Sequence, residues 1–261
     1  MANALLAGPA GFRGQTKWPA WAVLPAAFVI FVLAALAGYI AIWFYSAVLG
    51  ADAGIVAPGS TAQMTAAVVV WLAAMQLCVV LITYFAAGFF SSDRALTLSL
   101  VKPQGGWGIM FWALPPLFAI ALAWTGLLVL WKPEIVAQDL RPFVELMQGD
   151  AFWLVMFVIC IGAPLSEEIL FRGFLFTGLA KTRLGFIGTS LVTTILWTSL
   201  HAGYSIFGLV EVLWIGLYFS WLIVRTGSLW VTMFCHAVYN TAVALALLAV
   251  TLPPPPAPVV P

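Results

Sequence analysis

The sequence predicts an all-α protein, a polytopic bundle of about seven to eight transmembrane helices. Of its 261 residues, 64% are hydrophobic and only 7% are charged, whereas a soluble domain is about 25% charged. The apolar residues also occur in runs of about 20, the length that a helix needs to cross the hydrocarbon core. Thirteen tryptophans and nineteen phenylalanines add the aromatic content expected near membrane interfaces.

Seven apolar runs are long enough to be read as membrane helices, although the fifth and sixth are short. They are residues 20–48, 62–90, 107–131, 151–179, 186–201, 206–224 and 228–250. The chain divides around them into a cytoplasmic tail (1–17), amino-terminal membrane helices (18–131), an extracytoplasmic loop (132–150), a second membrane unit (151–250) and a proline-rich tail (251–261). Because proline cannot continue a helix, the last segment is predicted to be disordered.

The loop charges predict the orientation. Under this division one side of the membrane receives Arg13, Lys17, Arg94, Lys102, Lys181, Arg183 and Arg225, and the other receives Lys132 and Arg141. An excess of Lys and Arg marks the cytoplasmic side, so the amino terminus is expected in the cytoplasm. No internal repeat of the kind found in secondary transporters is present. The net charge of +1 gives no information about partners, and no basic block suggests a nucleic-acid partner.

Three ionisable residues, Glu167, Glu168 and Arg172, interrupt the fourth apolar run. A charge in mid-membrane costs roughly 3 kcal/mol or more and usually marks a functional site inside the protein. Glu168 and Arg172 are four residues apart, so they share a helix face and can pair. Glu167 points about 100° away, and we expect it to face a cavity as a general base. A purely structural ion pair stays open as the alternative.

The only two histidines of the chain, His201 and His236, also lie in apolar runs. A buried histidine is commonly a packing residue, but here polarity is expensive. Asn240 lies one turn beyond His236, so an imidazole and an amide can point to one place, as donors to an oxyanion do. Trp197, one turn before His201, either orients that imidazole or belongs to the core.

The other polar residues of the apolar runs carry weaker signals. Glu211 in the sixth run orders the site, pairs with a histidine or has a structural role. No Gly-x-Ser-x-Gly elbow and no His-Glu-x-x-His zinc motif occurs. Cys78, Cys160 and Cys235 lie in apolar runs without metal-like spacing and are expected to be small buried hydrophobes.

The polar membrane residues form three motifs in chain order, Glu167-Glu168-x-x-x-Arg172, Trp197-x-x-x-His201 and His236-x-x-x-Asn240. This pattern resembles the CAAX protease and bacteriocin-processing (CPBP, or Abi) family of intramembrane proteases, whose eukaryotic relatives are the Ras-converting prenyl proteases. The resemblance covers about residues 150–245 and would make 151–250 the protease core. The second motif is usually Phe-x-x-x-His, so its tryptophan is a conservative departure.

The resemblance implies proteolysis in the membrane by a glutamic endopeptidase. Glu167 would activate a water molecule with help from His201, while His236 and Asn240 would stabilise the oxyanion and Glu168 and Arg172 would support the site. Counted from the ends of the runs, Glu167 and His201 lie roughly 20–24 Å deep and His236 about 12 Å. The side chains can therefore meet near mid-depth only if the helices are strongly tilted.

The cofactor prediction is none, with zinc as the alternative. Glu167, His201 and His236 would be the ligands of an open three-ligand zinc site, but Arg172 would repel a nearby dication. The expected partners are the lipid bilayer and a membrane protein or a prenylated or leader-bearing peptide. The expected location is the cytoplasmic membrane of a bacterium. A scaffold or immunity protein without activity and a proton-coupled transporter stay open as other readings.

Overall fold

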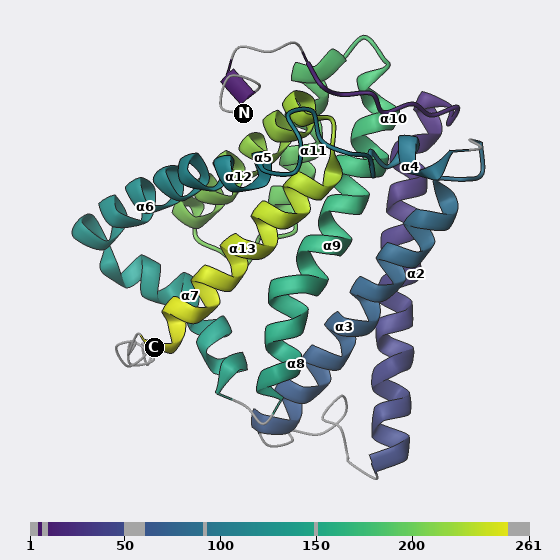
Figure 1. The fold of residues 1–261 in the computed structure, drawn as a ribbon. Coiled ribbons are helices and arrows are strands. Elements are labelled where there is room, and N and C mark those ends of the chain that lie inside the picture. The colour runs from purple at the N-terminus through teal and green to yellow at the C-terminus, as the bar shows by residue number, and fades with distance from the viewer. Residues whose placement is uncertain (1–4, 7–9, 50–60, 91–92, 149–150, 250–261) are drawn as a thin grey trace.

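The computed structural model describes residues 5–6, 10–49, 61–90, 93–148 and 151–249. All of the regular structure in these ranges is helical, which confirms the predicted all-α class (Figure 1). The amino-terminal part comprises α2 (Ala20–Leu49), α3 (Thr61–Ala86), α4 (Arg94–Thr97), α5 (Ile109–Trp112), α6 (Leu114–Trp131) and α7 (Pro133–Met147). The carboxyl-terminal part comprises α8 (Phe152–Phe157), η1 (Val158–Gly162), α9 (Ala163–Glu168), η2 (Ile169–Leu175), α10 (Phe176–Ala180), α11 (Gly185–Ser199), α12 (Ile206–Thr226) and α13 (Leu229–Leu248). The proline-rich tail lies outside the described residues.

Six helices in the described part of the chain are long and apolar enough to cross a membrane. They are Ala20–Val48, Ala66–Ala86, Ile109–Trp131, Phe152–Ala180, Ile206–Thr226 and Leu229–Leu248. The predicted fifth run, 186–201, corresponds to α11, which has only 15 residues. At about 1.5 Å per residue it is roughly 22 Å long, shorter than the hydrocarbon core of about 30 Å. The structure therefore has six full-length candidates where seven runs were expected.

The segments that carry the seven predicted cytoplasmic Lys and Arg residues meet at one end of the bundle. The backbone N–H of Gln15 donates to Leu96 O, and that of Gln104 donates to Thr226 O. The side chain of Lys181 donates to two carbonyls of the amino-terminal segment. The predicted gathering of these charges on one side is confirmed. That this side faces the cytoplasm stays a prediction of the charge rule.

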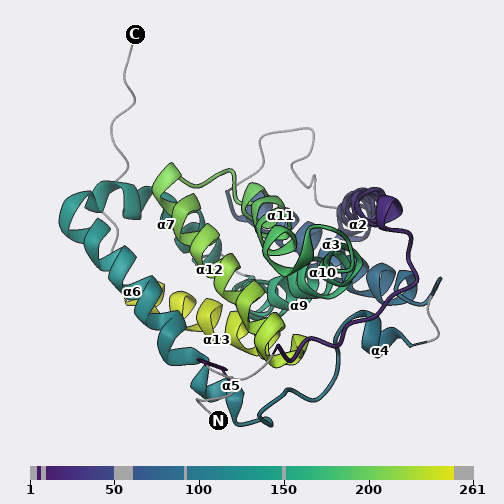
Figure 2. The ribbon, with the colours of Figure 1, turned by 90° about the horizontal axis from the view of Figure 1, so that it is seen from above.

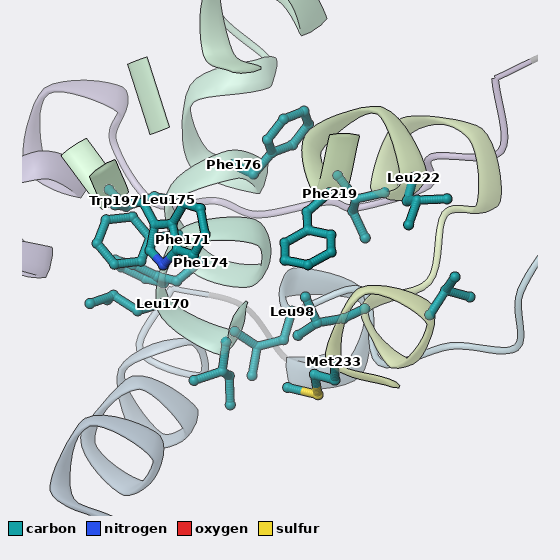
Figure 3. Packing of buried hydrophobic residues seen from close by; sticks show 14 of the residues in the cluster. Leu98, Leu170, Phe171, Phe174, Leu175, Phe176, Trp197, Phe219, Leu222 and Met233 are labelled. Carbon is teal, nitrogen blue, oxygen red and sulfur yellow. The ribbon is translucent and has the colours of Figure 1, made fainter. Parts of the chain in front are cut away.

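The long helix formed by α8, η1, α9, η2 and α10 is the centre of the bundle. Its most apolar window is 50% buried, compared with 22–39% for the other candidate spans. Viewed from above, α2 and α3 lie on one side of it, and α6, α12 and α13 on the other (Figure 2). Phe171, Phe174 and Phe176 of this helix form one core cluster with Trp197 and Phe219 (Figure 3). Charged side chains on this helix are therefore enclosed by protein.

Two π-helical stretches, η1 and η2, flank the turn that carries the glutamates. Proline explains the first, because Pro164 has no backbone N–H and its ring would clash with a preceding carbonyl in a regular α-helix. In η1 the N–H of Ala163 bonds to Val158 O, five residues back. The next bond of that register would join position 164 to Ile159 O, and Pro164 cannot supply it. Such π-turns are frequently found at functional sites.

The segment 132–150, expected to be an extracytoplasmic loop, contains the amphipathic helix α7. Its apolar residues Leu140, Phe143, Val144 and Met147 recur at helical spacing and pack in a second, smaller cluster. The helix forms because one face can be buried against α13 and α8.

Candidate active site

A buried ion pair anchors the polar cluster. Arg172 Nη1 lies 3.1 Å from Glu168 Oε1, and both side chains are fully buried. Arg172 Nη2 also donates to Gly216 O on α12 at 3.2 Å. A Cβ on Gly216 would collide with the Trp197 ring, so only glycine lets α12 approach this closely. The predicted pairing of Glu168 with Arg172 is confirmed.

Aromatic rings enclose the guanidinium group. The Cζ of Arg172 lies 4.4 Å from the centroid of the Trp197 ring and 5.7 Å from that of Phe219. A cation over an aromatic face is attracted by the ring quadrupole, which offsets part of the cost of removing the charge from water. The ion pair and the two rings thus form one buried, closely packed group.

Glu167 points away from this pair, as the helix geometry predicted. Its Oε2 accepts a hydrogen bond of 2.5 Å from the indole Nε1 of Trp197 and lies 4.0 Å from Nε2 of His236. Glu167 also lines a cavity of about 210 Å³ between α2 and α3 on one side and α9 and η2 on the other. The expectation that Glu167 faces a cavity is confirmed.

His236 of α13 bridges the two glutamates. Its Nδ1 lies 3.0 Å from Glu168 Oε1, so Nε2 is the nitrogen left to face Glu167. The ring packs on Phe219, with centroids 5.1 Å apart, and lies edge-on to Trp197 at 5.7 Å. Figure 1 shows α13 crossing α9 obliquely, and this tilt brings together residues whose depths along their own helices differ.

His201 is connected to the cluster through Trp197. The two rings are 5.0 Å apart in an edge-on arrangement, and Nδ1 of His201 lies 3.1 Å from the backbone carbonyl of Trp197. Among the described residues, no ion pair joins His201 to Glu167 or Glu168. The possible role of Trp197 beside the imidazole is therefore realised, but His201 stands one ring away from the carboxylates.

The Asn240 amide and the His236 imidazole bond to different partners. Its Nδ2 donates to Ile159 O at 2.9 Å, the carbonyl that Pro164 leaves without a backbone donor in the π-helical register. The structure therefore does not present the Asn240 amide and the His236 imidazole to a single shared partner. An amide nitrogen carries two hydrogens, and this bond uses one of them.

The turn after His201 is fastened to α7. Asp139 accepts hydrogen bonds from the backbone N–H of Ser205 at 2.7 Å and from its hydroxyl at 2.6 Å, and Ser205 caps α12 by accepting from the N–H of Gly208. Tyr204 in this turn lies beside His201. Burial raises the pKa of the Tyr204 phenol and Asp139 raises it further, so the phenol stays neutral.

Glu211 belongs to a separate polar group. Its Oε2 accepts a hydrogen bond of 3.0 Å from the Thr125 hydroxyl, and its Oε1 accepts one of 3.0 Å from the Tyr239 hydroxyl. The suggestion that it pairs with a histidine is not what the structure shows, because hydroxyls on α6 and α13 reach it instead.

The residues of the zinc alternative, Glu167, His201 and His236, do not form a ligand set in this structure. Within the described ranges, no three His, Cys, Asp or Glu side chains lie close enough together to hold a metal ion. Nδ1 of His201 is bonded to the Trp197 carbonyl and Nδ1 of His236 to Glu168, so Nε2 is the nitrogen that each ring has left for another partner.

Sequence reasoning missed two contributors to this site. The indole N–H of Trp197, a residue expected either to orient His201 or to belong to the core, bonds to Glu167 across 30 positions of the chain. Gln76 on α3 lines the cavity beside Glu167. A glutamine in the middle of an apolar run is a recognisable signal for such a residue, because polarity is costly there.

Comparisons with known proteins assign part of the chain. Residues 149–242 match the family model described as type II CAAX prenyl endopeptidase Rce1-like. The Bacillus subtilis (strain 168) protein named "Putative membrane peptidase YdiL" is 33% identical over 93 residues, 35% of this chain and 36% of that protein. The match thus spans about a third of the length of this curated relative. No solved structure matches the chain.

Proposed function

We propose, from the match of residues 149–242, that the chain is a member of the CAAX protease and bacteriocin-processing family and an intramembrane endopeptidase in which Glu167 activates the attacking water. The observation that carries the proposal is the division of labour between the glutamates. Glu168 is neutralised by the buried Arg172, whereas Glu167 lines a cavity. Only Glu167 can meet a water molecule and a substrate there.

The chemistry follows from the cavity position of Glu167. The carboxylate takes a proton from water as the water oxygen attacks the scissile carbonyl carbon, which forms a tetrahedral intermediate with a negatively charged oxygen. The same carboxyl group then delivers that proton to the leaving nitrogen. The carbon–nitrogen bond breaks and leaves a new amine and a new carboxylic acid, which keeps the second proton of the water and then releases it to the solvent. His201 orients the water or relays the proton.

Charge on the tetrahedral oxygen is received by His236 and Asn240. Nδ1 of His236 donates a hydrogen bond to Glu168, which fixes the ring so that Nε2 faces the Glu167 side of the cluster. Nε2 would donate to the oxyanion in the doubly protonated form of the ring, in which both nitrogens carry a hydrogen. Asn240 would contribute the amide hydrogen that its bond to Ile159 O leaves over. Donors held in place before the reaction stabilise an oxyanion without having to reorganise.

We propose that this reaction needs no metal. The buried guanidinium of Arg172 opposes a dication nearby, and among the described residues no three His, Cys, Asp or Glu side chains lie close enough together to hold one. A carboxylate alone is able to take the proton from water when the oxyanion is stabilised by hydrogen-bond donors.

The substrate class is proposed from the name of the matching family, which refers to CAAX prenyl endopeptidases. We expect a membrane-associated peptide or protein, either prenylated near its cleaved end or carrying a leader. The apolar walls of the cavity beside Glu167 are consistent with such a substrate. The proposed location is the cytoplasmic membrane of a bacterium, with the amino terminus in the cytoplasm.

The test is a cleavage assay on protein purified in detergent and returned to liposomes. Three kinds of quenched fluorogenic peptide are compared. The first carries a farnesylated cysteine followed by three residues, the second has the same sequence without the farnesyl group, and the third carries a leader. Cleavage of any of these peptides by the wild type, lost in Glu167→Gln with its thermal unfolding unchanged, supports the proposal. Undiminished cleavage by a folded Glu167→Gln protein overturns the assignment of the base. Absence of cleavage of every peptide favours a scaffold without activity.

A further inference from the structure

A glutamine lies in the middle of a membrane helix that the family match does not cover. Gln76 occupies the centre of the candidate span Ala66–Ala86, and it lines the same cavity as Glu167. Apart from Glu167, the cavity is enclosed mostly by apolar and aromatic side chains, such as Leu72 and Phe171. A polar side chain held at this depth is expensive and calls for a specific reason.

The amide of Gln76 is built into the wall beside the first π-turn. Its Oε1 lies against Gly162, where any Cβ would collide with it. Gly162 is the last residue of η1 and lies five positions before Glu167. The absence of a side chain at this glycine therefore gives the amide its place next to the helix that carries the proposed base.

The carbonyl oxygen of that amide is buried and has no hydrogen-bond partner among the described residues. If Gln76 served only to link α3 to the central helix, its polar atoms would be paired there, because an unpaired buried acceptor costs about 1–3 kcal/mol. This unpaired oxygen belongs to a side chain that lines the same cavity as Glu167. Rotation of the amide would therefore make its oxygen or its nitrogen available to a ligand that brings its own donor and acceptor. A peptide backbone brings both.

We propose that Gln76 binds the backbone of the substrate and positions the scissile bond next to Glu167. The inference rests on the proposed proteolytic function and extends the site to a helix outside residues 149–242. Rotation about the last bond of the side chain presents either the amide N–H to a substrate carbonyl or Oε1 to a substrate N–H. The aromatic and aliphatic walls of the cavity then accept an apolar side chain next to the bond that is cut.

The experiment compares Gln76→Leu with Thr83→Val as a matched control. Thr83 lies on the same helix and is fully buried, its hydroxyl has no hydrogen-bond partner in the described part of the chain, and it does not line the cavity. Binding of a dye-labelled farnesylated CAAX peptide is measured in the Glu167→Gln background, and kcat and KM are measured in the active protein. We expect Gln76→Leu to weaken binding and to lower kcat/KM by about tenfold, which corresponds to one lost hydrogen bond. Thr83→Val should change neither.

Thermal unfolding separates this role from a structural one. Replacing an unpaired polar group with an apolar one of similar size is neutral or stabilising, so Gln76→Leu should leave the Tm unchanged or raise it. A fall in Tm with unchanged peptide affinity would show that Gln76 is a structural link and would overturn the inference. Unchanged affinity, kcat and KM in Gln76→Leu would overturn it too. If Glu167→Gln is inactive in that case, the proposed function itself stands.

Discussion

The indole N–H of Trp197 donates a hydrogen bond of 2.5 Å to the carboxylate of Glu167. The same ring stacks on the guanidinium of Arg172 and lies edge-on to both histidines. Trp197 therefore joins the proposed base, its supporting ion pair and the two imidazoles through one side chain. In the related motif this position is usually phenylalanine, which can pack in the same way but cannot donate.

The first prediction tests that hydrogen bond. Trp197→Phe keeps a ring over Arg172 but leaves Glu167 without the donor that orients it, so kcat should fall by about tenfold, the lower end expected for a bond to a charged group. The Tm should change by no more than a few degrees. Trp197→Ala, which opens a large cavity, should lower stability by about 3–5 kcal/mol. Steady-state kinetics and thermal unfolding in detergent measure the two effects. Unchanged kcat and KM in Trp197→Phe would show that the bond has no part in catalysis.

The second prediction separates the paired glutamates. Glu168→Gln leaves the buried guanidinium of Arg172 without its counter-charge, which should cost about 3 kcal/mol or more and lower both the Tm and the activity. Glu167→Gln should abolish cleavage and leave the Tm near that of the wild type, because the shape is kept and this carboxylate borders a cavity. The pair of variants serves as its own control. An equal loss of thermal stability in both would argue against a specifically catalytic carboxylate.

The third prediction concerns the bond between Asn240 and Ile159. Asn240→Ala leaves the Ile159 carbonyl unpaired, which should cost about 1 kcal/mol and lower the Tm by a few degrees. Adding Pro164→Ala restores a backbone N–H at position 164 and should recover the lost stability. If Asn240 also serves the oxyanion, the double variant should be stable and still poorly active.

The control for this cycle is Pro164→Ala alone, which should be as stable as the wild type or more so. Recovery of both stability and activity in the double variant would assign Asn240 a purely structural role. Failure to recover stability would mean that the π-turn is not the source of the loss.

The fourth prediction concerns metal. Protein purified without chelator should contain well below one zinc per chain by elemental analysis, and its activity should survive exhaustive chelation followed by buffer exchange. The reason is the buried cation of Arg172, together with the finding that no three His, Cys, Asp or Glu side chains of the described residues lie close enough together to hold a metal ion. Stoichiometric zinc, with activity lost to chelator and restored by zinc alone, would reverse this assignment and leave the proteolytic function in place.

Local regularities of the chain determined the membrane character and part of the site. Hydropathy located the six full-length helices because crossing a bilayer demands a minimum run of apolar residues. The pairing of Glu168 with Arg172 followed from their spacing of four residues. The direction of Glu167, away from this pair, followed from the angle between successive residues of a helix. These features depend only on the geometry of one helix, so they can be derived from the spacing of residues in the sequence. The excess of charge on one side followed in the same way from the loops.

Only the tertiary structure decided which partners the polar residues would meet. His236 reaches Glu168 across 68 positions because α13 crosses the central helix obliquely, and Asn240 turns to the carbonyl that Pro164 leaves unpaired. The shortness of α11 and the helix within the expected loop likewise depend on neighbours. Helix tilt and approach are determined by how side chains, and glycines such as Gly216, fit against one another. Such packing involves residues far apart in the chain, so it cannot be derived from a local sequence pattern.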